Sequence, residues 1–335
     1  MVEAPRKTSE PSRIRSVIPR LLFAGGALAM LYYWVPMQDL SALLQGMPLV
    51  ALLAGLLLQL ASRLATAWRM TLLARYQGLA LDYRAMLRIL LSASFYTFVL
   101  PGIVLGGAAT YVKYRQHGGT AGQSLGNIVL NKGLEVLATL WLGVLALAWS
   151  WLGWSAALLA LAGLLDFIGM AHWLLRGGGA IDRLRHAASQ SRHAPVKHLG
   201  RLLAALNVLE SLRPAQTRHL LLAALAAQTV PVVSMFVFGW GLGLPVNPID
   251  VAWIYAAIYL MALLPLTVAN IGVREFTLIT VLAPLGINAA GATAWSLCMY
   301  LGPLVSAVLG LLLEAGHRPP RDSSPQSEGT DGTRE

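Results

Sequence analysis

Cysteine and charged residues are both scarce in this chain of 335 residues. Cys298 is the only cysteine, so an intrachain disulfide and a cysteine-based metal site are both excluded, and thiol redox chemistry with them. Charged residues make up 12% of the sequence and hydrophobic residues 56%. Ordinary soluble domains contain about 25% charged residues. The composition therefore predicts an all-α polytopic membrane protein.

Sequence motifs of several enzyme classes are also missing. The chain has no Gly-Lys-Ser/Thr phosphate loop, no Gly-x-Ser-x-Gly elbow and no His-Glu-x-x-His motif. Its seven histidines show no metal-ligand spacing, so we expect neither a metal nor another cofactor. Because no ATP site is visible, any transport is expected to be passive or coupled to an ion gradient.

Six apolar runs are each long enough to cross a bilayer, which requires about 20 residues. They cover approximately 18–36, 47–68, 123–149, 154–175, 219–244 and 290–314. The basic N-terminus followed by an apolar run is similar to a signal peptide, with a small-residue site at Ala27-Leu28-Ala29. That site lies only a few residues into the run, so we interpret 18–36 as an uncleaved first span.

Two further apolar stretches, 89–112 and 251–286, are interrupted at their middle in the same way. The residues of the breaks are Pro101, Gly102, Gly106 and Gly107 in the first stretch, and Pro265 and Gly272 in the second. Proline removes a backbone donor and glycine tolerates unusual dihedral angles, so helices should be interrupted there. Since unpaired backbone in lipid costs several kcal/mol per group, the paired breaks predict a cavity between two repeats.

The net charge of +10 is best explained by cytoplasmic loops rather than by nucleic acid. The segment 176–217 alone carries seven Lys and Arg residues against two acidic ones, and the N-terminal arm 1–17 is also basic. No basic stripe is interleaved with aromatic residues, so nucleic acid is not an expected partner. We therefore assign the arm, the segment 176–217 and the C-terminus to the cytoplasm.

Tracing the chain from these loops places both flanks of 89–112 inside and both flanks of 251–286 outside. The link 37–46 is also placed outside. We therefore predict two re-entrant hairpins that enter from opposite faces, as inverted-topology repeats do. The alternative is that each broken segment forms one long kinked span or two short spans.

One transmembrane domain is expected over 18–315, followed by a disordered, proline-rich tail over 316–335. Within 176–217, leucines recur with a helical period from Val196 to Leu212. This pattern indicates either an amphipathic helix on the membrane surface or a packing helix that caps the bundle.

Ionisable residues at membrane depth are functional candidates, because a charge in lipid is costly. Lys132 and Glu135 lie three residues apart on one helix face. Arg274 and Glu275 follow the second break, and Lys113 has the matching place after the first. Cations around a cavity suit an anionic headgroup such as a phosphate.

Simpler interpretations stand beside these candidates. Lys132 and Glu135 can equally form a structural ion pair. Arg69 is interpreted as an interfacial residue whose charged end reaches the headgroups. Arg63 and Arg69 are six residues apart, and we do not expect them on one helix face.

With these residues located, the chain resembles the lysylphosphatidylglycerol synthase transmembrane family, also called the flippase-like domain family. The resemblance covers residues 15–315. It is carried by Trp68-Arg69-Met70-Thr71-Leu72-Leu73, Leu100-Pro101-Gly102 with Gly106-Gly107, Asn131-Lys132-Gly133-Leu134-Glu135, and Asn270-Ile271-Gly272-Val273-Arg274-Glu275. It implies a bacterial inner-membrane protein that moves lipids or lipid-linked precursors, and it adds Asn131 and Asn270 to the candidate site.

The sequence departs from the family pattern at two carboxylates. Ala108 follows Gly106-Gly107 where relatives often have Asp, and Asn131 precedes Lys132 where many have an acidic residue before Arg. Both departures disfavour proton coupling. In one branch the domain is fused to an aminoacyl transferase, but we expect no such domain in this polar tail. The resemblance therefore does not imply lysylphosphatidylglycerol synthesis.

We expect a flippase for a lipid or lipid-linked amphiphile with an anionic headgroup. The headgroup is expected to move past Lys113, Lys132 and Arg274. The alternative is a membrane enzyme, or its accessory subunit, in polyprenyl, hopanoid or phospholipid biosynthesis. Its acid/base chemistry would need Glu135, Glu275 or Asp166. A third hypothesis is a purely structural partner of a synthase. Expected partners are membrane lipids and a lipid-synthesis enzyme.

Overall fold

The computed structural model describes residues 37–99, 103–155, 158, 161–163, 213–263 and 272–316, and every secondary structure element in these ranges is a helix. Four helices are long and apolar enough to cross a membrane. They are α3 (Leu49–Tyr76), α6 (Ala121–Leu152), α11 (Pro214–Gly241) and α14 (Ala289–Ala315). The protein is therefore a multi-pass membrane protein, and these helices cover four of the six predicted spans.

Several predictions fall outside the described residues. They concern the span 18–36, most of 154–175, the leucine-periodic stretch 196–212 and the tail from 317 onwards.

Each of the two broken stretches forms two helices. α4 (Tyr83–Val99) precedes α5 (Ile103–Gln116), and α12 (Pro248–Ala262) precedes α13 (Val273–Leu282). α4 packs against α5, and α12 packs against α13. Gly272 caps α13 with a φ of 88°, a left-handed conformation that favours glycine. Pro101, Gly102 and Pro265 lie outside the described residues.

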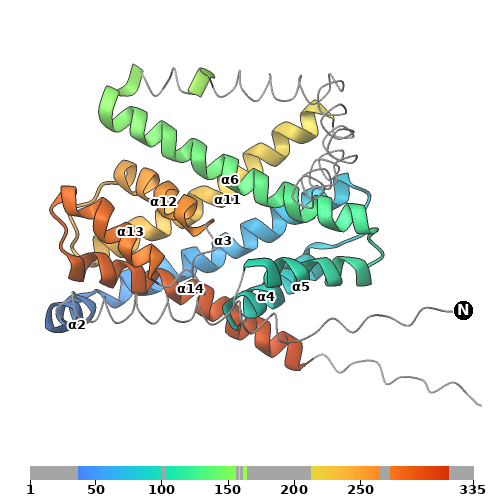
Figure 1. Cartoon of the computed structure of the whole chain (residues 1–335), viewed down its shortest axis with the longest axis horizontal. Coiled ribbons are helices and arrows are strands. Elements are labelled where there is room, and N and C mark those ends of the chain that lie inside the picture. Colours follow the sequence, from blue (N-terminus) through green and yellow to red (C-terminus); the bar gives the residue numbers. More distant parts are fainter. Residues whose placement is uncertain are drawn as a thin grey trace, which may run out of the picture.

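Each helical hairpin packs against a helix of the other half of the chain, so the two halves exchange their hairpins. α3 packs against α11, while α4 packs against α14 and α12 packs against α6. Figure 1 shows the pair α4 and α5 at one end of the bundle and the pair α12 and α13 at the other. The first arm of each hairpin thus contacts a long helix of the other half, α14 in one case and α6 in the other.

Glycines at equivalent places allow the exchanged contacts. A Cβ atom added to Gly143 of α6 would overlap the Cβ of Ala256 on α12. A Cβ atom added to Gly310 of α14 would overlap the backbone oxygen of Leu91 on α4. Both glycines lie at a similar distance from the start of their helices. The absence of a side chain lets the helix backbones approach closely, as small residues do in membrane helix packing.

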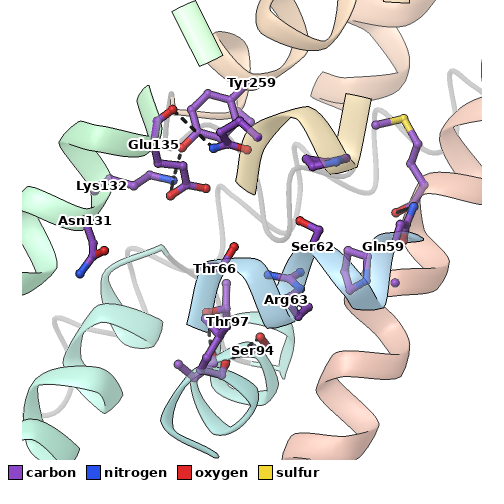
Figure 2. A pocket seen from close by; sticks show the side chains of 18 of the residues that line it. Gln59, Ser62, Arg63, Thr66, Ser94, Thr97, Asn131, Lys132, Glu135 and Tyr259 are labelled. Carbon is purple, nitrogen blue, oxygen red and sulfur yellow. Dashed lines mark hydrogen bonds and ion pairs between the residues drawn. The ribbon is translucent and has the colours of Figure 1, made fainter. Parts of the chain in front are cut away.

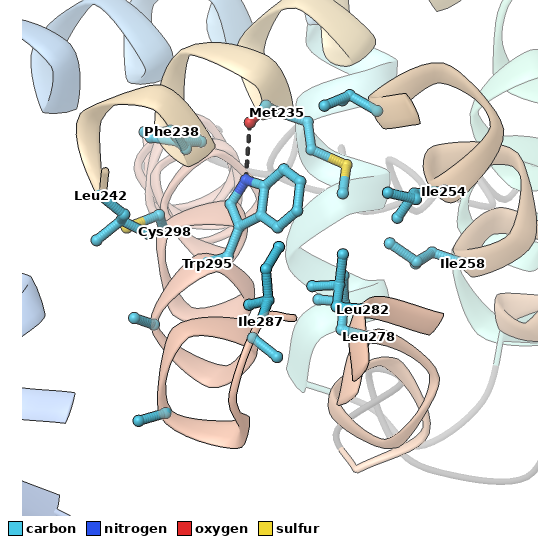
Figure 3. Close-up of a cluster of buried hydrophobic side chains, with 14 of the residues drawn as sticks. Met235, Phe238, Leu242, Ile254, Ile258, Leu278, Leu282, Ile287, Trp295 and Cys298 are labelled. Carbon is cyan, nitrogen blue, oxygen red and sulfur yellow. Dashed lines mark hydrogen bonds between the residues drawn. The ribbon is translucent and has the colours of Figure 1, made fainter. Parts of the chain in front are cut away.

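The largest apolar core joins α11, α12, α13 and α14. Trp295 is fully buried, and its indole N–H donates to the backbone oxygen of Met235 at 2.7 Å (Figure 3). Phe238, Ile254 and Leu278 complete the centre of this core. This packing fixes the second hairpin against α14, and the short 3₁₀ turn η1 (Ala283–Leu285) connects the two.

Two elements differ from the sequence interpretation. The link 37–46, for which no helix was predicted, forms the helix α2 (Met37–Gly46). Helix α3 continues past the expected end of the second span at residue 68 and stops before Gly78, whose φ is 74°. The extension follows from a run of good helix formers, and it carries Arg69 into the helical bundle.

Candidate functional site

A cavity of about 630 Å³ opens between helices of both halves. α3, α4, α5, α6, α11, α12, α13 and α14 all contribute to its wall. Its basic side chains are Arg63, Arg69, Lys132 and Arg274, and Glu135 is the one acidic side chain among the described lining residues. The cavity therefore has an excess of positive charge.

The polar side of the cavity on α3 repeats with helical spacing. Gln59, Ser62, Arg63, Thr66 and Arg69 all line it, and Figure 2 shows the first four of these along one stretch of α3. Such spacing of three to four residues defines one helix face. Arg63 and Arg69, which are not expected on one helix face, both line the cavity, because the wall takes in about 120° of the helix surface.

Arg69 is not an interfacial residue. It is only 2% exposed, and its Nε and Nη1 atoms have no hydrogen bond partner among the described residues. A guanidinium carries five donors that ordinarily find partners when buried. The arginine therefore lies at the wall of the cavity with unused donors.

Lys132 and Glu135 form the predicted ion pair and also line the cavity. The Lys132 Nζ lies 3.3 Å from Oε2 of Glu135 and donates to the hydroxyl of Tyr259 at 2.7 Å. Figure 2 shows all three side chains together, with Tyr259 coming from α12. The side-chain amide of Gln228 on α11 also donates to the backbone oxygen of Glu135, at 3.4 Å. These contacts connect α6 with the second hairpin and with α11.

Arg274 and Glu275 lie 3.9 Å apart, between Nε and Oε1, and both contact Ser296, but only Arg274 lines the cavity. Arg274 lines the cavity, with its guanidinium 3.4 Å from the ring centre of Tyr300 and its Nε 3.0 Å from Ser296 Oγ. Glu275 is 4% exposed and accepts hydrogen bonds from the Gly272 N–H at 2.6 Å and from Ser296 Oγ at 2.5 Å. Glu275 thus caps α13 and holds Ser296, which in turn orients Arg274.

The remaining candidates lie at several places. Lys113 is ion-paired with Glu314 of α14 and does not belong to the cavity wall. Asn131 lines the cavity and is 5% exposed. Gly107 lines it too, Gly106 belongs to α5, and Asn270 lies outside the described residues.

Sequence reasoning missed part of the site. The polar repetition from Gln59 to Arg69 in an otherwise apolar helix was a readable signal for a cavity-facing stripe. No sequence signal marked Tyr259 and Tyr300, because tyrosine is common at membrane interfaces.

The chemistry of the wall favours anion binding. Guanidinium and ammonium groups form strong charge-assisted hydrogen bonds with phosphate oxygens. Among the described residues, no group of three His, Cys, Asp or Glu side chains could hold a metal ion. The site is thus a polar pocket with basic side chains, inside a bundle of apolar helices.

Comparison with known proteins agrees with this architecture. No curated protein sequence matches the chain with statistical significance. The family model described as the lysylphosphatidylglycerol synthase TM region matches residues 17–310, which include both hairpins and the cavity. The chain therefore belongs to the lysylphosphatidylglycerol synthase transmembrane family.

Proposed function

We propose that this protein moves a lipid, or a lipid-linked amphiphile, with an anionic headgroup between the two leaflets. The observation that carries the proposal is the cavity whose described wall holds four basic side chains, from both halves of the chain, and one carboxylate. An anionic headgroup pays a large desolvation cost in hydrocarbon. A basic cavity lowers that barrier, while the acyl chains stay in the bilayer.

The extent of the polar wall supports this role. From Gln59 to Arg69, α3 rises by about 15 Å at 1.5 Å per residue. The hydrocarbon core of a bilayer is about 30 Å thick. A headgroup that follows this wall therefore avoids roughly half of the apolar distance.

In this proposal the two helical pairs are re-entrant hairpins that enter from opposite faces of a bacterial inner membrane. Each of their arms has at most 17 residues, fewer than the about 20 needed for a span. Asn131, Lys132, Glu135 and Arg274, together with the arginines of α3, contact the headgroup. Lys113 and Glu275 support the helices that carry these residues.

The hairpin topology predicts where a thiol reagent can reach. His117 is exposed in the turn after α5, and in the proposal it faces the cytoplasm. In a Cys298→Ser background, His117→Cys should therefore be protected from an impermeant thiol reagent added to intact cells. Gln38→Cys, exposed on α2 and assigned to the outside, should react under the same conditions. Reaction of the His117→Cys variant from outside would contradict the first hairpin.

Transport is tested in liposomes that contain the purified protein. Fluorescent phospholipids with anionic or zwitterionic headgroups are placed in both leaflets, and a membrane-impermeant quencher is then added. We expect the anionic reporter of the inner leaflet to become accessible faster than in empty vesicles, and the zwitterionic reporter to lag behind. Exchange at the rate of empty vesicles for every lipid would refute the proposed function.

A further inference from the structure

Helix α14 contains a proline at the wall of the cavity. Pro303 lies in the middle of this helix, directly after Gly302, and both residues line the cavity. Proline has no backbone N–H, so the backbone oxygen of Met299, four residues earlier, lacks its ordinary helical donor. An unpaired backbone group inside a membrane costs several kcal/mol. The Met299 oxygen therefore requires a donor from elsewhere.

Gln59 of α3 supplies this donor. Its Nε2 donates to the backbone oxygen of Met299 at 3.4 Å, which is above the usual distance for such a hydrogen bond. Figure 2 shows Gln59 on α3 beside the ribbon of α14. A Cβ atom added to Gly302 would overlap this side chain, so the glycine makes room for it. Oε1 of Gln59 has no hydrogen bond partner among the described residues. One weak hydrogen bond thus connects α3 with α14 at the proline.

The two halves of α14 are fixed to different partners. Before the proline, Trp295 is buried in the core that α14 shares with α11 and the second hairpin. After the proline, Gly310 touches the backbone of α4, and Glu314 is ion-paired with Lys113 of α5. A bend of α14 at its proline therefore moves the first hairpin relative to the second.

The first hairpin is also held at the far end of α3. Met86 of α4 and Tyr114 of α5 belong to one apolar cluster with Met70 and Ala74 of α3. From Gln59 to Met70, α3 rises by about 16 Å. The cluster is thus remote from the Gln59 contact, and it provides a pivot about which the hairpin can turn.

Helix α6 has a similar contact without a proline. Gln228 of α11 donates to the backbone oxygen of Glu135 on α6, also at 3.4 Å. Four residues after Glu135 stands Thr139, which has a backbone N–H, so this oxygen keeps its helical donor. Loss of the Gln228 contact therefore leaves α6 a regular helix.

Helix α11 has a proline, but α3 supports it on both sides. Before Pro231, Leu220 packs in one cluster with Leu73 of α3. After Pro231, Phe238 lies against Gly55 of α3. Of the four spanning helices that the structure describes, α14 is the one that combines a proline with different partners on its two sides.

We propose that Gly302 and Pro303 form a hinge in α14 and that Gln59 is the latch that keeps this hinge closed. With the latch made, α14 lies against α3. When Gln59 releases Met299, α14 bends, its end moves together with the first hairpin, and the cavity opens between α3 and α14. Because Met299 lines the cavity, water can then hydrogen-bond to the released oxygen. The hinge does not depend on which ligand occupies the cavity.

A double-mutant cycle tests the latch. Gln59→Leu removes the donor and should lower the melting temperature of the full chain in detergent by about 2 °C, because the Met299 oxygen is left unpaired. Pro303→Ala restores a backbone N–H, so Gln59→Leu should have less than half of this effect in that background. Pro231→Ala is the matched control, and the full effect of Gln59→Leu should persist there. An effect that is equal in all three backgrounds, or reduced by both alanines, overturns the latch.

Distances between spin labels test the hinge. In a Cys298→Ser background, labels are attached to Leu57→Cys on α3 and Leu312→Cys on α14, two exposed positions. Gln59→Leu should add a longer distance between them, and a further Pro303→Ala should remove it. The reference pair Leu57→Cys and Phe276→Cys should keep one distance throughout.

Two results contradict the hinge. The first is a distance distribution between the labels on α3 and α14 that is the same with and without Gln59→Leu. The second is a longer distance that persists when Pro303→Ala is added. Neither measurement involves leaflet exchange, so the hinge can be established even where the proposed function fails.

Discussion

Arg69→Met is expected to reduce leaflet exchange of an anionic lipid at least about tenfold while raising the melting temperature of the protein. The loss follows because charge-assisted hydrogen bonds to phosphate contribute about 1.5–3 kcal/mol. The gain in stability follows because Arg69 is a buried cation whose Nε and Nη1 lack hydrogen bond partners among the described residues. A buried charge without hydrogen bond partners carries a desolvation penalty that an apolar side chain of similar volume does not.

The opposite signs of the two effects separate a binding role from a structural one. Exchange is measured with the reporter lipids in liposomes, and stability by thermal unfolding in detergent. Arg75→Met is the matched control, since Arg75 is exposed on the same helix and outside the cavity wall. Arg75→Met should change neither the rate of lipid exchange nor the melting temperature appreciably. An Arg69→Met variant that loses both exchange and stability would assign Arg69 to packing, and unchanged exchange would exclude it from the path.

Gly310→Ala is expected to destabilise the fold strongly for so small a change. The added methyl group meets the backbone oxygen of Leu91, which cannot turn aside as a flexible side chain could. Overpacking of this kind costs about 1–3 kcal/mol, and α14 must move away from α4 to relieve it. Thermal unfolding in detergent should show a melting temperature lower by several degrees. Gly143→Ala should behave likewise, because the equivalent contact holds α6 to α12.

Gly122→Ala provides the control for the glycine variants. Gly122 also lies in a helix, but nothing is found within 4 Å of an added Cβ there. Alanine has the higher helix propensity, so this variant should melt at the same temperature as the wild type or slightly above it. If all three variants melted alike, the exchanged contacts between the halves would not depend on small residues.

The predicted site was partly recoverable from sequence because charges in apolar helices are conspicuous. Lys132, Glu135 and Arg274 were identified in this way, and all three line the cavity. Arg69 was misinterpreted because the apolar run was taken to end at residue 68, whereas α3 continues to Tyr76. Lys113 was placed by analogy with Arg274. Its pairing with Glu314 depends on α5 meeting α14, which local sequence does not encode.

The sequence by itself determined that the chain is a helical membrane protein with two interrupted stretches. Hydrophobic length, proline and glycine act locally, so these features can be read without knowing the neighbours. Only the tertiary structure decided which charges share a cavity and which are ion-paired elsewhere. The exchange of hairpins between the halves brings α3 and α6 together with α12, α13 and α14 around one space. Burial and hydrogen bonding of a side chain depend on such contacts between distant segments, and for Arg69 they turn an apparent surface residue into the wall of the cavity.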